Sequence, residues 1–250
     1  MSDFDPKSKY IPFDTINLKE RKWPNQIIEK APTWCSVDLR DGNQSLIEPM
    51  DTAKKLKLFN TLISMGFKEI EIGFPSASET DYNFCRHLIK NNLIPKTVTI
   101  QVLTQAREHL IDKTFESLEG CHSAIIHLYN SVSILQRKVV FKQDRQGVKK
   151  IALDGANMIF QRLEELENSN IRLQYSPESF TGTELDYALE VCEEVLDCWK
   201  AKPNNPIIIN LPATVEMSTP NIYADQIEWM VNNFSDRNRV ILSLHPHNDR

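Results

Sequence analysis

Two histidines stand two positions apart near the end of the chain, in the segment His245-Pro246-His247. At this spacing on a β-strand, both side chains leave the same face. Two imidazoles and one carboxylate form a facial set of metal ligands, with open positions for water or substrate. The pair alone fits ordinary polar residues equally well. We interpret His245 and His247 as metal ligands because a candidate carboxylate is also present.

Asp41 is that carboxylate, in the polar segment 38–44 that follows the first apolar run. We expect it to complete a metal site with the two histidines. Arg40 is expected to be catalytic, because a guanidinium beside a metal and a substrate oxygen stabilises an enolate or alkoxide as charge develops. The alternative for Arg40 is a structural ion pair with Asp38 or Glu178.

Three further polar residues belong to the candidate site. Glu178 follows Pro177 and is expected to orient Arg40 or to position a substrate, with a solvated loop acid as the alternative. His127 is expected to hydrogen-bond a substrate carbonyl or carboxylate, unless it is a buried core histidine. Thr214 either donates its hydroxyl to a substrate carboxylate or caps the next segment.

Short β-branched or apolar runs alternate with longer amphipathic segments from residue 33 onward. Segment 51–65, for example, has apolar residues at the three-to-four spacing of one helical face, with Asp51 as its expected N-cap. Strands that alternate with helices indicate a parallel sheet, because parallel neighbours need a crossover that is usually helical. Seven strands are expected, at residues 33–37, 69–72, 97–103, 124–129, 171–175, 206–211 and 240–244.

These elements predict an α/β fold, a (β/α)8 TIM barrel whose eighth strand is missing from this chain. An open doubly wound sheet usually has a glycine-rich phosphate turn after its first strand, but Asp-Gly-Asn-Gln stands at residues 41–44. In a barrel the active site lies at the C-terminal ends of the strands. The first and seventh strands are close together in a closed barrel, so we expect the metal ligands to meet.

Length and composition restrict the class of protein. A chain of 250 residues suits one barrel, and we expect a leader at residues 1–30 and a catalytic domain at residues 31–250. The net charge of −5 and the lack of any apolar run of about 20 residues predict no nucleic-acid or membrane partner. The polar N-terminus resembles neither a signal peptide nor a transit peptide, so we expect a cytoplasmic enzyme with reduced cysteines.

The Asp-Leu-Arg-Asp-Gly-Asn-Gln motif at residues 38–44 closely resembles the signature of the metal-dependent, Claisen-condensing barrel enzymes. This family includes the 2-isopropylmalate, homocitrate and citramalate synthases and the lyase that cleaves hydroxymethylglutaryl-CoA. The combination of Arg-Lys-Trp-Pro at residues 21–24, Ser-Pro-Glu at residues 176–178 and Asn-Leu-Pro-Ala-Thr-Val-Glu at residues 210–216 looks most like the long form of the 2-isopropylmalate synthases. The resemblance continues at residues 66–78, 175–178, 210–216 and 245–250.

By this resemblance, Asp41, His245 and His247 hold a divalent cation (Mg, Mn, Zn or Co), with K+ as a candidate activator. Arg40 would polarise the keto oxygen, and Glu178 would help to arrange the catalytic groups. The implied reaction removes a proton from the methyl group of acetyl-CoA, adds the enolate to 3-methyl-2-oxobutanoate and hydrolyses the thioester. The product would be 2-isopropylmalate, in the first committed step of leucine biosynthesis.

His127 and Thr214 would contact the 2-oxo acid in such an enzyme, which would be a homodimer. The family associates its general base with a region beyond the barrel. An Asn metal ligand on the eighth strand and a C-terminal leucine-binding regulatory domain are expected past Arg250. We therefore expect residues 1–250 alone to be poorly soluble or partly molten, and inactive.

Three alternatives stay open. One is a homocitrate or citramalate synthase, which differs in the 2-oxo acid that it accepts. Another is a metallohydrolase on the same barrel, although those enzymes usually carry the His-x-His pair on the first strand. The third is an inactive fragment that retains the site.

Overall fold

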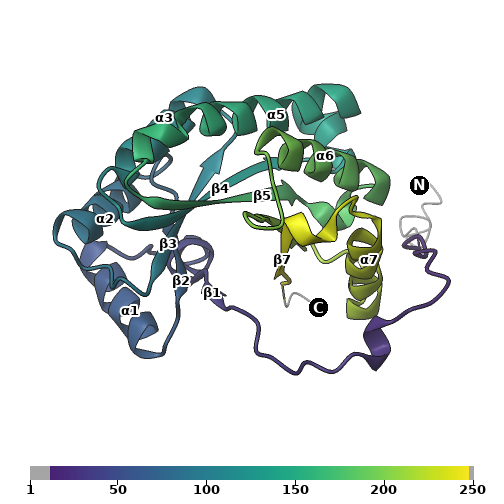
Figure 1. Cartoon of the computed structure of the whole chain (residues 1–250), viewed down its shortest axis with the longest axis horizontal. Helices are drawn as coiled ribbons and strands as arrows, with labels where there is room; N and C mark the ends of the chain where they lie inside the picture. Colours follow the sequence, from purple (N-terminus) through teal and green to yellow (C-terminus); the bar gives the residue numbers. More distant parts are fainter. Residues whose placement is uncertain (1–11, 248–250) are drawn as a thin grey trace, which may run out of the picture.

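The computed structural model describes residues 12–247, which form one curved parallel sheet covered on its outer face by helices (Figure 1). The seven strands are hydrogen-bonded in chain order, from β1 to β7, and every neighbouring pair is parallel. The strands are β1 (Cys35–Ser36), β2 (Glu69–Gly73), β3 (Thr99–Gln105), β4 (Ser123–Ser131), β5 (Asn170–Glu178), β6 (Ile207–Pro212) and β7 (Val240–His245).

Every crossover between neighbouring strands contains a helix, as parallel pairing requires. The expected N-cap Asp51 is confirmed, because its Oδ1 accepts the Lys54 amide at 2.8 Å. The helices are α1 (Thr52–Ser64), α2 (Glu79–Lys90), α3 (Glu108–Leu118), α4 (Ile134–Gln136), α5 (Arg145–Arg162), α6 (Leu185–Cys198) and α7 (Pro220–Asn233).

The predicted barrel architecture with seven strands is confirmed, and several strands differ in length from the prediction, among them β1 and β5. The first strand is only two residues long, because Val37 already begins a π-helical turn, Asp38–Gly42, and its carbonyl accepts the amides of residues 40, 41 and 42. The fifth strand is longer than expected, because its pairing with β4 continues to Glu178. The lengths of β1 and β5 affect the site, because they place Asp41 in a turn beyond the end of β1 and Glu178 at the last paired position of β5.

Side chains of the strands alternate between two environments. One face packs under the helices and carries buried apolar residues, such as Ile72 on β2 and Ile126 on β4. The other face lines the barrel interior and carries polar residues, among them Glu71, Gln101 and His127, which are buried together in the middle of their strands. This alternation follows from the two-residue period of a strand and separates the core from the site.

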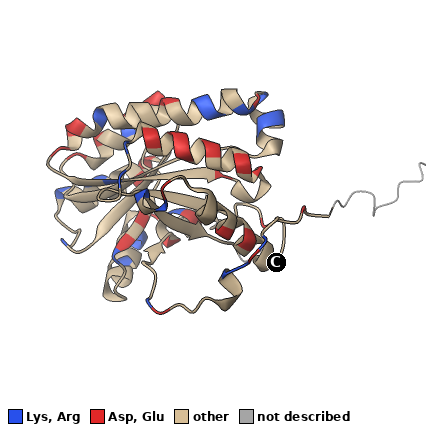
Figure 2. Cartoon of the chain, turned by 45° about the vertical axis from the view of Figure 1, so that its right-hand side comes forward, with Lys and Arg blue, Asp and Glu red and all other residues tan. Residues whose placement is uncertain are grey.

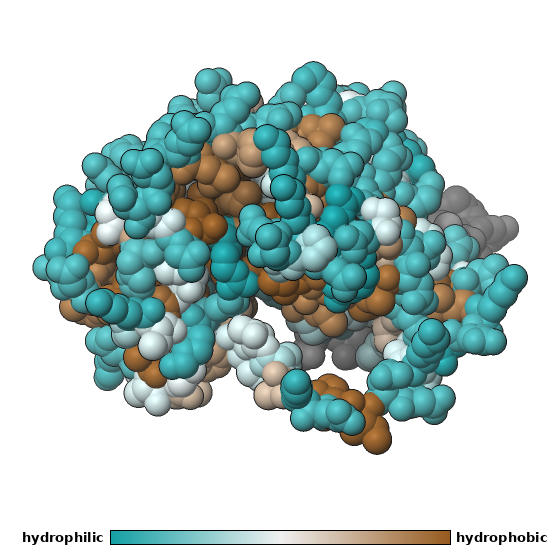
Figure 3. Space-filling model, in the orientation of Figure 1, coloured by the Kyte–Doolittle hydropathy of each residue, from teal (hydrophilic) through white to brown (hydrophobic). Residues whose placement is uncertain are grey.

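Residues 21–23, in the segment that we expect to be a leader, lie against α7. Arg21 donates through Nε and Nη2 to the Asp225 carboxylate, at 2.8 Å each, and Trp23 Nε1 donates to Asp225 at 2.9 Å. From there the leader runs along the lower edge of Figures 1 and 3 to β1, with Ile27 and Ile28 exposed. This segment therefore spans the two edges of the sheet.

Charged residues cover the outer helices, and acids and bases lie close together there (Figure 2). Lys149 on α5 lies 2.5 Å from both Glu190 and Glu194 on α6, which ties these two helices together. None of the helices in the described part of the chain is long and apolar enough to cross a bilayer.

Candidate metal centre and active site

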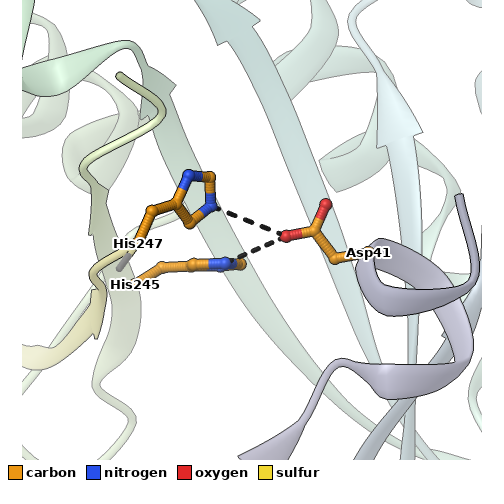
Figure 4. A group of neighbouring side chains, drawn as sticks. All are labelled: Asp41, His245 and His247. Carbon is orange, nitrogen blue, oxygen red and sulfur yellow. Dashed lines mark ion pairs between the residues drawn. The ribbon is translucent and has the colours of Figure 1, made fainter. Parts of the chain in front are cut away.

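The structure brings Asp41, His245 and His247 together (Figure 4). Asp41 Oδ2 lies 3.0 Å from His245 Nε2 and 3.7 Å from His247 Nε2, and the candidate ligand atoms all lie within 4.8 Å of one another. His245 ends β7, and Asp41 belongs to the π-helical turn after β1. The two edges of the sheet therefore meet through these side chains, although residues 12–247 contain no β1–β7 strand pairing.

The donor set suits a divalent cation. The hydrogen bond with His245 and the charge of Arg40 lower the pKa of Asp41 against the opposing effect of burial, so its carboxylate is ionised. One carboxylate oxygen and two imidazole nitrogens are ligands accepted by Zn, Mn and Co, and they leave positions for a substrate. The chemistry of the three residues therefore fits the predicted metal.

Arg40 forms two ion pairs inside the site. Its Nη1 lies 2.6 Å from Asp41 Oδ1, and its Nε donates to Glu71. Burial opposes the charge of Arg40, but the carboxylates of Glu71 and Asp41 outweigh this effect and raise the pKa of the guanidinium. The predicted alternative partners were Asp38 and Glu178, and Arg40 instead uses a strand residue that the sequence reasoning did not single out.

That residue, Glu71, is fully buried on β2. Its carboxylate accepts hydrogen bonds from Arg40 Nε, Gln101 Nε2 and His127 Nδ1, the last at 2.8 Å. Burial raises the pKa of Glu71, but the charge of Arg40 and the hydrogen bonds from His127 and Gln101 lower it by more, so the net shift is downward. The sequence contains a feature that could have identified Glu71, because it is an acid in the middle of a predicted strand, on the face opposite Ile70 and Ile72.

His127 is buried, and both of its ring nitrogens have partners. Nδ1 lies 2.8 Å from Glu71 and Nε2 lies 2.6 Å from Ser176 Oγ, which in turn accepts from Asn210 Nδ2 at 2.7 Å. Burial lowers the pKa of His127, so the ring is neutral. Because the ionised Glu71 needs a donor, the Nδ1 atom carries the proton and Nε2 accepts from the Ser176 hydroxyl. Ser176 and Asn210 were not assigned a role from the sequence.

Glu178 and Thr214 lie at the same end of the barrel. The Glu178 carboxylate accepts from the Ser131 hydroxyl. Thr214 Oγ1 accepts a hydrogen bond from the Ser179 amide at 2.9 Å. The hydroxyl hydrogen of Thr214 therefore points away from this amide. Glu178 is therefore held by β4, at Ser131.

A cavity of about 370 Å³ brings together all seven residues singled out from the sequence. The lining also includes Phe74, Leu103, Tyr129 and Pro212, so apolar surface faces part of the polar cluster. A second cavity of about 610 Å³ shares Arg40, Gln44 and Phe74 with the first and lies against the start of α1 and α2. The seven residues that were singled out from the sequence and that line the first cavity are Arg40, Asp41, His127, Glu178, Thr214, His245 and His247.

Comparison with known proteins gives consistent results. The profile of the family described as HMGL-like matches residues 31–250. The 2-isopropylmalate synthase of Parafrankia sp. (strain EAN1pec) is 63% identical over 98% of this chain and 44% of the relative. The protein of the same name from Clostridium acetobutylicum is 61% identical over 97% of this chain and 44% of the relative. The chain thus spans less than half the length of these curated relatives.

Two solved structures share the fold. An HMG-CoA lyase from "Acenitobacter baumannii", in complex with coenzyme A and 3-methylmalate, aligns with a TM-score of 0.61 and 19% identity, over 86% of this chain and 66% of that one. The HMG-CoA lyase of Bacillus subtilis aligns with a TM-score of 0.60 and 16% identity, over 85% and 67%. At these identities the likeness concerns the fold alone, and it supports the barrel assignment.

Proposed function

The chain belongs to the HMGL-like family, and we propose that it is the catalytic barrel of a 2-isopropylmalate synthase. This acyltransferase would condense acetyl-CoA with 3-methyl-2-oxobutanoate and release CoA. The observation that carries the proposal is the single cavity in which a candidate metal-ligand set, an arginine and an apolar wall lie together. The names of relatives with about 60% identity support the same reaction.

Asp41, His245 and His247 would hold the divalent cation, which supplies Lewis-acid polarisation of the 2-oxo acid when bound. Arg40 stabilises the negative charge that develops on the keto oxygen as the enolate of acetyl-CoA attacks. Its buried partner Glu71 accepts from Nε and Asp41 accepts from Nη1, so the guanidinium of this cavity-lining arginine is held at two of its nitrogens.

Other residues would orient the 2-oxo acid. The Thr214 hydroxyl can donate to the substrate carboxylate, because its oxygen already accepts the Ser179 amide. His127 would contact the substrate from the polar layer that it shares with Ser176, and Glu178 would order the rim of the cavity. Hydrolysis then adds water to the thioester carbonyl, breaks the C–S bond and releases CoA.

The cavity favours a branched apolar 2-oxo acid over 2-oxoglutarate. Leu103, Phe74 and Tyr129 offer apolar surface for an isopropyl group. A second substrate carboxylate would need a second cation, and Arg40 is the one Lys or Arg that lines this cavity in residues 12–247. A homocitrate synthase is therefore the weaker alternative. The wider neighbouring cavity would take part of acetyl-CoA.

The remaining parts of the proposal come from the resemblance. They are a divalent cation among Mg, Mn, Zn and Co, K+ as an activator, a homodimer and a cytoplasmic location. Residues 31–250 would be the catalytic domain, preceded by a leader at residues 1–30.

The test is release of the CoA thiol from acetyl-CoA, measured by spectrophotometry in a protein with the full length of the relatives. We expect turnover with 3-methyl-2-oxobutanoate and a divalent cation, and much less with pyruvate or 2-oxoglutarate. Faster turnover with either of those acids would replace the proposal with a citramalate or homocitrate synthase.

A further inference from the structure

Lys55 is a fully buried lysine on α1, next to the π-helical turn Asp38–Gly42. Its ammonium group donates to the Leu39 carbonyl at 2.8 Å, to the Ile72 carbonyl at 3.1 Å and to Asp81 Oδ1 at 2.5 Å. An ammonium group has three N–H donors, so these three partners use all of them. Lys55 is therefore committed to internal contacts and does not line the metal-site cavity.

Asp81, near the start of α2, connects Lys55 to the loop after β2. Its Oδ1 binds Lys55, and its Oδ2 accepts the Phe74 amide at 2.7 Å. Gly73 has a φ of +156°, and a Cβ atom there would lie 2.5 Å from Asp81 Cγ. Glycine is thus required for the carboxylate to approach this backbone. The Lys55–Asp81 pair joins the loop after β1 to the loop after β2.

Both of these loops form walls of the candidate active site. The Leu39 carbonyl belongs to the peptide bond whose nitrogen is that of Arg40, so the Lys55 hydrogen bond restrains the plane of this peptide. Phe74, held by Asp81 from the other side, lines the same cavity as Arg40 and Asp41. A change in the Leu39–Arg40 peptide would redirect both side chains that follow it.

We propose that Lys55 and Asp81 are positioning residues, which set the orientation of Arg40 and Asp41 for metal binding and condensation. The inference rests on the proposed function and extends it to Lys55, which lines neither cavity, and to Asp81, which lines the wider neighbouring cavity. Removing partners that orient metal ligands typically costs about 10–100-fold in metal affinity or activity. A displacement of about 1 Å in a reacting group can cost about 100-fold in rate.

The test uses the Lys55→Met variant, which keeps the length and the apolar stem of the side chain and removes its three donors. In a protein with the full length of the relatives we expect kcat to fall about 10–100-fold, with a smaller change in KM for the 2-oxo acid. The affinity for Co2+, measured by titration of its absorption spectrum, should fall in the same range. Hydrogen exchange of the amides in residues 38–44 should become faster.

Asp81→Asn is the second variant, because Asn has one acceptor oxygen where Asp81 uses two. We expect the same changes in kcat, Co2+ affinity and exchange, and this variant decides the question if Lys55→Met does not fold. Lys149→Met is the matched control, since Lys149 also pairs with two groups but joins α5 to α6 on the outer face. It should lower the melting temperature and leave kcat and Co2+ affinity unchanged.

Variants at positions 55 and 81 that keep kcat, Co2+ affinity and amide exchange within twofold of the unmodified protein would overturn the inference. The pair would then only stabilise the fold, as Lys149 does. If the unmodified protein fails to condense acetyl-CoA with any 2-oxo acid, the proposed function is wrong. The Co2+ titration and the exchange of residues 38–44 then still decide whether the pair orients the turn.

Discussion

Replacing Glu71 with Gln should damage both stability and catalysis, because one buried carboxylate holds two groups of the site. The change keeps the shape of the side chain and removes its charge. The Nε atom of Arg40 then loses a charged partner, and His127 Nδ1 donates to a neutral oxygen in place of a carboxylate. The guanidinium is left with Asp41 as its charged neighbour within the described residues.

The expected size of the effect follows from burial, since Glu71 is fully buried and the Arg40 side chain is 12% exposed. Breaking a buried ion pair by removing one partner costs about 3–5 kcal/mol. A change of 1 kcal/mol shifts Tm by about 2–4 °C in a domain of this size, so Tm should fall by about 6–20 °C. Loss of the Arg40 orientation should lower kcat by about a hundredfold, as for an oxyanion donor.

The stability difference should also depend on pH. The pKa of Glu71 is lower in the folded state than its ordinary value of 4.5. Its stabilising contribution is therefore fully present above about pH 4.5 and is lost as the pH falls toward the folded pKa. Unfolding curves of the two proteins should differ most at neutral pH and converge in acid.

The assay is thermal unfolding of both proteins between pH 3 and pH 8, together with CoA release at pH 7.5. Glu190→Gln is the control, because the Glu190 side chain is 38% exposed and pairs with Lys149 on the surface, where such pairs contribute about 0–1 kcal/mol. Equal Tm values for the Glu71 variant and the unmodified protein, with equal kcat, would refute the argument from burial.

Four further outcomes are expected. Asp41→Ala or His245→Ala should abolish condensation and reduce bound divalent metal, and undiminished metal by elemental analysis in both variants would remove the metal assignment. Arg40→Lys keeps the charge but loses the planar fork, so kcat should fall about a hundredfold or more, and a value within threefold of the unmodified enzyme would exclude the proposed role. Burial raises the pKa of Cys85 to about 12, so this thiol should stay unlabelled by Ellman's reagent at pH 8 until the protein is unfolded. Within residues 12–247 the edge strands β1 and β7 are not paired with each other, so we expect residues 1–250 expressed alone to unfold broadly and to show no turnover, and a sharp transition with turnover would contradict this.

Patterns that are local in the chain were sufficient to predict the architecture. Apolar runs and helical periodicity located the seven strands and the helices between them, and the N-cap at Asp51 was correct. The His-x-His spacing of His245 and His247 was also informative, because residues two apart on a strand share a face whatever surrounds them. The position of Asp41 after the first strand followed from the rule that a barrel site lies at the C-terminal strand ends.

Contacts between residues that are distant in the chain could not be predicted from such local patterns. Glu71 meets Arg40 across 31 positions and His127 across 56, and Lys55 reaches Asp81 across 26. The register of neighbouring strands and the curvature of the sheet select which inward side chains touch, and neither quantity is encoded in a short window. A charged residue inside an apolar segment signals that a buried partner must exist, because an unpaired buried charge is too costly. Which partner it has is a property of the folded sheet.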